Sequence, residues 1–198
     1  ERAQQKVEGR NFDIRKTLIK FDDVMNDQRQ VIFSQRLKIL KSNSISETLE
    51  SFLDEVILDL IEVKNNYEKS NNKTIYLNAI KKITGNILND DELIELTIEN
   101  KDRFTKKIKD LFYSKHQERI KLIGTNENID IEKRVFLQII DFSWRSHLQY
   151  LEQLREVVGL RSYGQKDPLS EFKKEAFGLF EGLLEKIKID VIKFLLNL

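Results

Sequence analysis

The chain has 198 residues, with 34 Lys and Arg against 33 Asp and Glu, so its net charge is +1. A chain so close to neutrality has no global field that would recruit nucleic acid or an anionic membrane surface. Charged residues make up 34% and hydrophobic residues 40%, which is typical of a folded protein rather than a disordered one. The sequence has no cysteine for a disulfide or a thiolate metal site, and no apolar run long enough to predict a membrane span.

The first predicted element is one long helix over residues 3–40. This segment has no Pro and a single Gly, Gly9, so nothing in it stops a helix. Its apolar residues form a continuous stripe, and others fall on two further flanks, so the helix needs partners on several sides and is interpreted as a strut. The stripe contains Val7, Ile14, Leu18, Phe21, Met25, Ile32 and Ile39, one flank contains Phe12, Ile19, Phe33 and Leu37, and the other contains Val24 and Val31.

The residues of this helix also indicate a protein family, which their periodicity alone would not. Residues 7–16 (VEGRNFDIRK), 20–29 (KFDDVMNDQR) and 31–36 (VIFSQR) closely resemble the start of the helical scaffold domain of SecA, the ATP-driven motor of bacterial protein export. A solvated helix face would account for a lone cluster of polar residues, but not for a nearly continuous run of identities. The run includes polar choices that no amphipathic pattern demands, namely Asn11, Asp13, Asp22, Asp23, Asn26 and Gln28.

A polar break over residues 41–47 ends the long helix, and Ser44 followed by Glu47 is typical of a capping box that starts another. The block that follows has its own apolar faces and no catalytic constellation. We expect a small helical domain over residues 43–126, which by position corresponds to the wing domain of SecA. Its helices are predicted over 46–69 (with Leu49, Phe52, Leu53, Val56, Ile57, Leu60 and Ile61 inward), 74–83, 90–98 and 101–122 (with Phe104, Ile108, Leu111 and Phe112 inward).

Two long helices are predicted to close the chain as an antiparallel hairpin. After a stop at residues 124–128 (GTNEN), Asn128 or Asp130 would cap a helix that ends near Gly159. A polar loop then leads to a helix over residues 169–196, with Pro168 in its first turn. The inward residues are predicted to include Val135, Ile139, Phe142, Leu148, Leu151 and Val158 in the first helix, and Phe172, Ala176, Phe177, Phe180, Leu183, Leu184, Ile187, Val191 and Leu195 in the second.

This hairpin resembles the two-helix finger of SecA, including its loop, over residues 143–156 (SWRSHLQYLEQLRE) and 160–177 (LRSYGQKDPLSEFKKEAF). Gly159, Gly164 and Phe172 depart from the residues common in the family, and the two glycines are expected to loosen the loop. The resemblance covers residues 3–40 and 130–197. It implies an all-α fold with a scaffold helix over 1–42, an inserted wing over 43–126, and a finger over 127–198 packed back on the scaffold.

Tyr163 is predicted to lie at the tip of the finger. Between Ser162 and Gly164 its ring has little to pack against, and an amphipathic aromatic side chain can grip a passing peptide without selecting a sequence. The alternative is an ordinary exposed turn tyrosine. The resemblance implies contact with translocating polypeptide at the mouth of the SecY channel, made by Tyr163 and its neighbours Leu160, Arg161, Ser162, Gln165 and Lys166.

Polar residues of the first helix are a second candidate site. Asp22, Asp23 and Asp27 lie within two turns, but a helix face spreads carboxylates instead of converging them on a cation, so no metal site is expected. His116 and His147 lie in different predicted helices without a metal-binding spacing, and Trp144 is interpreted as core. The resemblance implies contacts with the nucleotide-binding domains of SecA, made by Asn11, Asp13, Arg15, Asp22, Asp23, Asp27 and Arg29.

The chain has no GxxxxGKS/T loop, so ATP and Mg²⁺ are expected to bind in domains outside it, and the chain alone should hydrolyse nothing. A start at Glu1, without Met or a signal peptide, indicates a piece of a longer protein. The resemblance implies partners in a SecY-type channel, unfolded preproteins and the remaining SecA domains, with a homodimer left open. It also implies a location in the cytoplasm and peripherally at the inner membrane.

Three alternatives remain at this stage. The heptad-like stripe also suits a self-associating helical adaptor without motor function. The basic residues suggest nucleic-acid binding, which the near-neutral charge disfavours. The third alternative is an enzyme in its own right, which a failure to bind nucleotide would dismiss.

Overall fold

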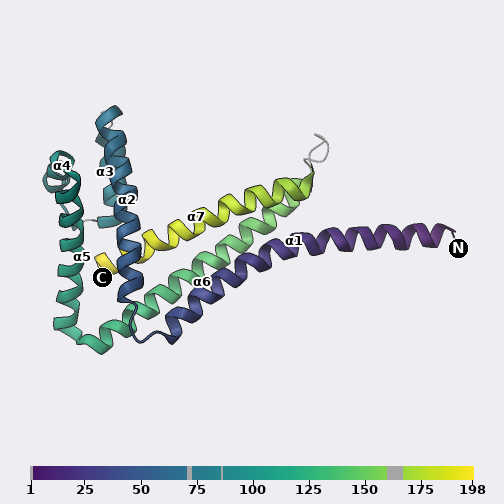
Figure 1. Ribbon diagram of the computed structural model, residues 1–198, viewed down its shortest axis with the longest axis horizontal. Helices are drawn as coiled ribbons and strands as arrows, with labels where there is room; N and C mark the ends of the chain where they lie inside the picture. The colour runs from purple at the N-terminus through teal and green to yellow at the C-terminus, as the bar shows by residue number, and fades with distance from the viewer. Residues whose placement is uncertain (1, 71–72, 86, 160–166) are drawn as a thin grey trace. The chain divides into compact units, whose positions relative to one another are not determined.

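The computed structural model describes residues 2–70, 73–85, 87–159 and 167–198. These residues form α-helices and no strand, which confirms the all-α prediction (Figure 1). The chain divides into unit 1, Glu1–Lys38 with Ile140–Glu185, and unit 2, Ile39–Ile139 with Lys186–Leu198. The helices are α1 (Arg2–Lys41), α2 (Ser46–Ser70), α3 (Lys73–Thr84), α4 (Asp90–Ile98), α5 (Lys101–Ile123), α6 (Thr125–Val158) and α7 (Pro168–Asn197).

The long first helix is continuous, as predicted, but only part of its apolar surface is covered. Every described side chain from Gln4 to Lys20 is exposed, and burial begins at Phe21. Val7 and Leu18, in the predicted stripe, are therefore exposed, whereas Ile32 is 1% exposed. The expectation of cover on several sides is wrong for the described residues, because unit 1 supplies helices along one side only. The exposed flank consists of Phe12, Ile19, Phe33 and Leu37.

Unit 1 has a core between α1 and the hairpin that α6 and α7 form (Figure 1). The rings of Phe21 and Phe172 meet edge to face, with centroids 4.9 Å apart, a geometry that adds about 0.5–1.5 kcal/mol to simple burial. Phe142 and Phe177, predicted to point inward, are 66% and 61% exposed. They lie on the outer arc of helices whose inner arc already fills the core. That core contains Phe21, Leu151, Val158, Phe172 and Ala176, with Val24, Met25, Leu154 and Leu169 packed against it.

Unit 2 has a separate core in which α2 packs against α3 and α5, and α3 against α4. The 3.6-residue spacing that predicted these helices also predicted their buried faces. Phe52 is half-buried, with its ring centroid 5.3 Å from that of Phe136 in α6. The predicted residues that are buried are Leu49, Leu53, Val56, Ile57, Leu60 and Ile61 in α2, and Phe104, Ile108 and Phe112 in α5.

The caps of α2 and α6 differ from the prediction. Helix α2 begins at Ser46 as predicted, but Ile45 occupies the capping position, and Ser44 Oγ accepts from the Ser46 N–H at 3.2 Å. Helix α5 ends at Ile123 and is capped by Gly124, whose φ of 88° lets one residue turn the chain, so α6 begins at once at Thr125. The predicted five-residue stop is therefore one residue long, and Asn128 is not a cap but a buried residue inside α6.

The start of α7 follows the prediction. Pro168 is its first residue, where the missing N–H of proline costs no hydrogen bond. The preceding Asp167 accepts from the Ser170 N–H at 3.0 Å and from the Ser170 hydroxyl at 2.6 Å. These hydrogen bonds lower the pKa of Asp167, so its carboxylate stays charged beside the positive end of the helix.

Candidate functional site

The predicted finger tip lies outside the described residues. Those residues are Leu160, Arg161, Ser162, Tyr163, Gln165 and Lys166. The structure does describe the helix ends on either side. Val158 is buried at the end of α6, and the side chain of Asp167 caps α7. The tip residues are thus preceded and followed by anchored helix ends, and their contact with polypeptide stays a prediction.

The predicted scaffold contacts divide into two groups. Asn11, Arg15, Asp23, Asp27 and Arg29 are exposed on α1, where another domain could reach them, and the side chain of Asp13 lies outside the described residues. Asp22 differs, because its Oδ1 lies 3.2 Å from Arg155 Nη1 of α6. Asp22 therefore already has a partner within unit 1.

Arg155 was missed by the sequence reasoning, although it joins α6 to α1. Its guanidinium carbon lies 5.9 Å from the centroid of the Phe21 ring, in addition to its ion pair with Asp22. A guanidinium over an aromatic face is attracted by the negative charge of the ring face. Local sequence spacing could not predict these contacts, because Asp22 and Phe21 lie more than a hundred residues before Arg155.

A buried polar bridge connects all three helices of unit 1. Gln28 of α1 donates from Nε2 to the carbonyl of Ala176 in α7 at 3.0 Å. Its Oε1 lies 2.8 Å from His147 Nε2 in α6, so the imidazole donates and the amide accepts. Gln28 and His147 are 7% and 4% exposed. One side-chain amide thus fixes α6 and α7 against α1 at the same point.

The imidazole of His147 lies between two aromatic side chains. The centroids of the Trp144 and Phe180 rings lie 5.6 and 5.8 Å from that of its imidazole. Burial among these groups lowers the pKa of His147 below its ordinary 6.5. The ring is therefore neutral at pH 7, and its one proton sits on Nε2, where Gln28 requires it.

Unit 2 has a buried charged cluster at the corner between α5 and α6. Arg119 Nη2 lies 3.1 Å from Glu132 Oε1, and Arg119 Nε donates to Asn128 Oδ1 at 3.2 Å. Asn128 Nδ2 and His116 Nε2 approach the same Glu132 oxygen at 3.0 and 3.2 Å. Arg119 also donates to the carbonyl of Leu195 near the end of α7. Since the donors of Arg119 are used by protein groups, the cluster is suited to holding structure rather than substrate.

In the part of the chain that the structure describes, no three His, Cys, Asp or Glu side chains come together as a metal site. None of the described helices combines the length and the apolar character needed to cross a membrane.

Comparison with known proteins identifies the family. The family described as "SecA Wing and Scaffold domain" matches residues 1–198, the whole chain. The chain belongs to this family. The resemblance to SecA, seen at residues 3–40 and 130–197, is therefore confirmed, and the match extends through the block between them.

Curated SecA proteins cover the chain completely. Protein translocase subunit SecA of Pelagibacter ubique (strain HTCC1062) is 50% identical over 198 residues, which are 100% of this chain and 23% of that protein. The protein of the same description from Hyphomonas neptunium (strain ATCC 15444) is 36% identical over 206 residues, covering 100% of this chain and 22% of its own length. The chain thus spans less than a quarter of the length of these SecA relatives.

Gln28 has a different role from the one that the sequence suggested. In the sequence it was one of several SecA-like polar residues of a helix whose polar side chains were expected to contact other domains. The structure instead buries Gln28 between α1, α6 and α7. A SecA-like polar residue on this helix can therefore be part of the internal framework of unit 1.

Proposed function

We propose that this chain is the mechanical part of a SecA-type motor that uses ATP to drive preproteins through a SecY-type channel. In this proposal α1 contacts the nucleotide-binding domains of a longer protein, and the α6–α7 hairpin is the finger that touches the moving polypeptide. The observation that carries the proposal is the asymmetry of α1. From Phe21 onward one side is buried against the hairpin, while Phe12, Ile19, Phe33 and Leu37 stay exposed.

The exposed apolar residues of α1 support its contact with further domains. Phe12 and Phe33 are 63% and 54% exposed, and with Ile19 and Leu37 they place four large apolar side chains on one flank of the helix, which is typical of an interaction surface. The SecA relatives contain more than three quarters of their length outside the matched segment, so they have protein available to cover such a surface. The polar residues proposed to take part in these contacts are Asn11, Asp13, Arg15, Asp23, Asp27 and Arg29.

The internal contacts of unit 1 support transmission of movement. A force applied to α1 moves the hairpin only if the helices cannot slide past each other. Sliding by one residue would break the Gln28 bridge, the contact between the Phe21 and Phe172 rings, and the ion pair between Arg36 and Asp141, at 3.0 and 3.3 Å. Such coupled rigid elements are a common basis of domain movement.

The remaining features of the proposal concern the longer protein. ATP and Mg²⁺ would bind in its nucleotide-binding domains, so the present chain would hydrolyse nothing by itself. Its partners would be the SecY-type channel, unfolded preproteins and the other SecA domains. The working location would be the cytoplasm and the cytoplasmic face of the inner membrane, through peripheral contact.

The coupling is tested in the full-length protein with Phe33→Asp, which places a charge on the exposed side of α1. We expect the amount of substrate translocated per ATP hydrolysed to fall, because the scaffold no longer follows the nucleotide-binding domains. Leu122→Asp is the matched control, since Leu122 is 83% exposed on α5 in unit 2. Equal coupling ratios in the two variants would contradict the proposal.

The finger tip is tested with a photo-crosslinking amino acid at Tyr163 of the full-length protein and a stalled export substrate. We expect capture at Tyr163 and none at Trp144, which is buried in unit 1. Capture at Trp144 but not at Tyr163 would reject the tip assignment.

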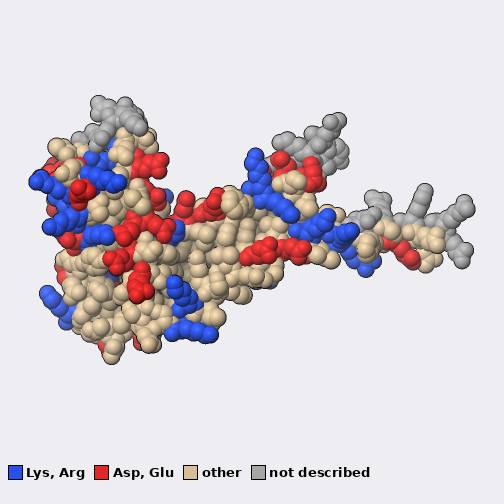
Figure 2. All heavy atoms as spheres, viewed as in Figure 1, with Lys and Arg blue, Asp and Glu red and all other residues tan. Residues whose placement is uncertain are grey.

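A self-associating adaptor is the alternative that the same exposed surface favours, because a second copy could cover it. Sedimentation over a concentration series separates the two proposals. A dimer that persists on dilution and dissociates in Phe33→Asp would favour the adaptor. Nucleic-acid binding has less support, because blue and red side chains are interspersed on the face shown in Figure 2.

A further inference from the structure

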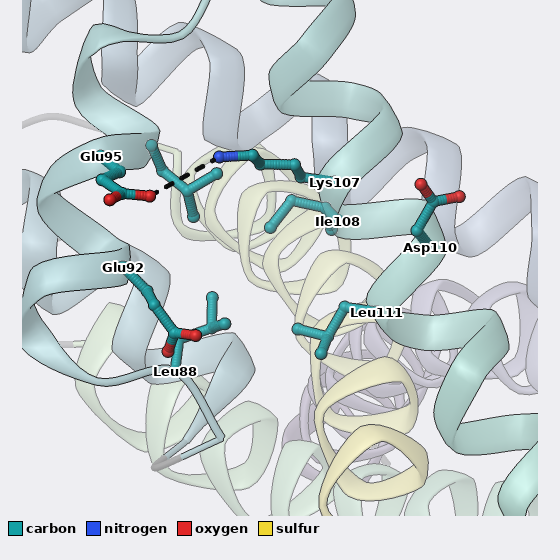
Figure 3. A pocket seen from close by; sticks show the side chains of 8 residues that line it. Leu88, Glu92, Glu95, Lys107, Ile108, Asp110 and Leu111 are labelled. Carbon is teal, nitrogen blue, oxygen red and sulfur yellow. Dashed lines mark ion pairs between the residues drawn. The ribbon is translucent and has the colours of Figure 1, made fainter.

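A groove in unit 2 between α4 and α5 is not used by the proposed motor function (Figure 3). Its volume is about 300 Å³. The floor is apolar, and charged side chains stand at its edges. Leu88, Leu96, Ile108 and Leu111 form the floor, and Glu92, Glu95, Lys107 and Asp110 complete the lining.

The charge of the groove is negative. Glu92 and Glu95 of α4 face α5 across the gap, and Lys107, the one cation among the described residues of the lining, projects from α5 toward them (Figure 3). Lys107 Nζ lies 3.0 Å from Glu99 Oε1 but 4.0 Å from Glu95 Oε2. These distances place the ammonium group mainly against Glu99, and its hydrogen bond lowers the pKa of Glu99. Glu95 is 72% exposed and can meet a second cation.

The backbone around the groove is well fixed. Asn89 caps α4 by accepting from the Glu92 N–H at 2.9 Å, and Glu92 Oε2 accepts from the Asn89 N–H at 2.9 Å. One oxygen of Glu92 is used in this capping box, and the carboxylate has a second one. Leu96 and Ile108 are 3% and 2% exposed and belong to the core of unit 2, where they support the floor from below. The half-buried Leu88 and Leu111 are the apolar residues that a ligand would meet.

We propose that this groove binds a short basic segment of polypeptide. An apolar side chain of the segment would lie on Leu88 and Leu111, and a Lys or Arg close to it in the segment would pair with Glu95 and with the second oxygen of Glu92. The volume is at the lower end of the range for ligand pockets, so it fits a side chain or two rather than the face of a folded domain. Anions and nucleic acid would meet like charge.

The probe is a short fluorescein-labelled peptide of Leu, Arg, Gly and Ser, and the readout is its anisotropy with the 198-residue chain. We expect saturable binding that weakens about tenfold in Glu95→Lys, because a rim charge facing the peptide is reversed. Asp91→Lys is the matched control, since Asp91 is exposed on the same helix outside the groove lining, and should change the affinity little. Circular dichroism checks that both variants keep their helices.

Two peptide controls separate the parts of the site. Replacing Arg by Glu in the peptide should abolish binding, and replacing Leu by Ser should weaken it. The proposal is overturned by a lack of saturation, by equal effects of Glu95→Lys and Asp91→Lys, or by equal binding of the Glu peptide. Binding to the 198-residue chain but not to the full-length protein would also overturn it, because the groove would then be covered by another domain.

Discussion

The two units contain buried polar clusters of opposite character. In unit 1 the amide of Gln28 joins a neutral imidazole, His147, to the backbone of Ala176. In unit 2 the guanidinium of Arg119 meets the carboxylate of Glu132, with Asn128 bonded to both. Both clusters connect three helices, but only the second buries formal charge.

The difference determines how each cluster responds to change. A neutral hydrogen-bonded bridge contributes modestly, and losing one partner leaves a single unsatisfied group. A buried ion pair costs desolvation of both ions, so removing one partner leaves an uncompensated charge. The corner of unit 2 should therefore be much more sensitive to a single substitution than the helix junction of unit 1.

The largest effect is expected for Glu132→Gln. The change leaves the charge of Arg119 buried without its carboxylate, which typically costs about 3–5 kcal/mol. Hydrogen exchange measured on α5 peptides should show this loss of protection. Asp130→Asn, at an exposed position two residues away, should stay within about 0.5 kcal/mol. The double change Arg119→Met with Glu132→Leu should recover much of the stability. A small loss in Glu132→Gln together with no recovery in the double variant would contradict a buried ion pair between Arg119 and Glu132.

Gln28→Ala should have the next largest effect. It leaves the N–H of His147 without its acceptor, an expected cost of about 1–3 kcal/mol. Urea unfolding is followed through Trp144, the single tryptophan of the sequence, which lies beside His147. The control is Gln30→Ala, because Gln30 is exposed on the same helix. Equal midpoints for the two variants would contradict a structural role for the bridge.

The pH dependence of unit 1 should show a smaller effect. The pKa of His147 is lowered in the folded state, so below about pH 6.5 the unfolded chain binds more protons than the folded one. The free energy of unfolding should therefore fall as the pH drops from about 6.5 toward the folded-state pKa. His147→Gln removes this contribution, and urea titrations of both proteins at several pH values should diverge in that window. Parallel curves would show that His147 does not titrate differently on folding.

The smallest effect is expected for the pair of Arg36 and Asp141. The pair is bidentate, at 3.0 and 3.3 Å, but its side chains are 39% and 48% exposed. A double-mutant cycle with Arg36→Ala and Asp141→Ala should give a coupling of about 0.2–1 kcal/mol, which decreases with added salt. A coupling as large as the effect of Glu132→Gln would remove the distinction between buried and exposed charge.

The sequence predicted unit 2 better than it predicted α1. In α2 the apolar spacing and the burial coincide, because the partners of Leu53 and Ile57 are other helices of the same unit. In α1 the same apolar spacing predicted that Val7 and Phe12 would be covered, but both are exposed. Periodicity identifies a face that prefers burial, but it does not say whether the covering protein belongs to the same segment.

Polar residues were the least predictable part of the site. Asn128 or Asp130 was predicted to cap a helix because Asn and Asp are favoured there, yet Gly124 turns the chain and α6 begins before both. The contacts of Gln28, His147 and Arg119 could not be predicted locally, since their partners lie far away in sequence. The tip residues around Tyr163 were predicted from the resemblance alone, and they lie outside the described residues.

The single-residue joint at Gly124 has a consequence for how this corner can vary. One extra residue between Gly124 and Asn128, inside the first turn of α6, would rotate the rest of α6 by about 100° about its own axis, since a helix has about 3.6 residues per turn. Asn128 and Glu132 would then rotate away from Arg119 together, and no local repacking would return both. We therefore expect natural insertions and deletions to avoid this corner, and its length to be inherited as strictly as the identity of any buried side chain.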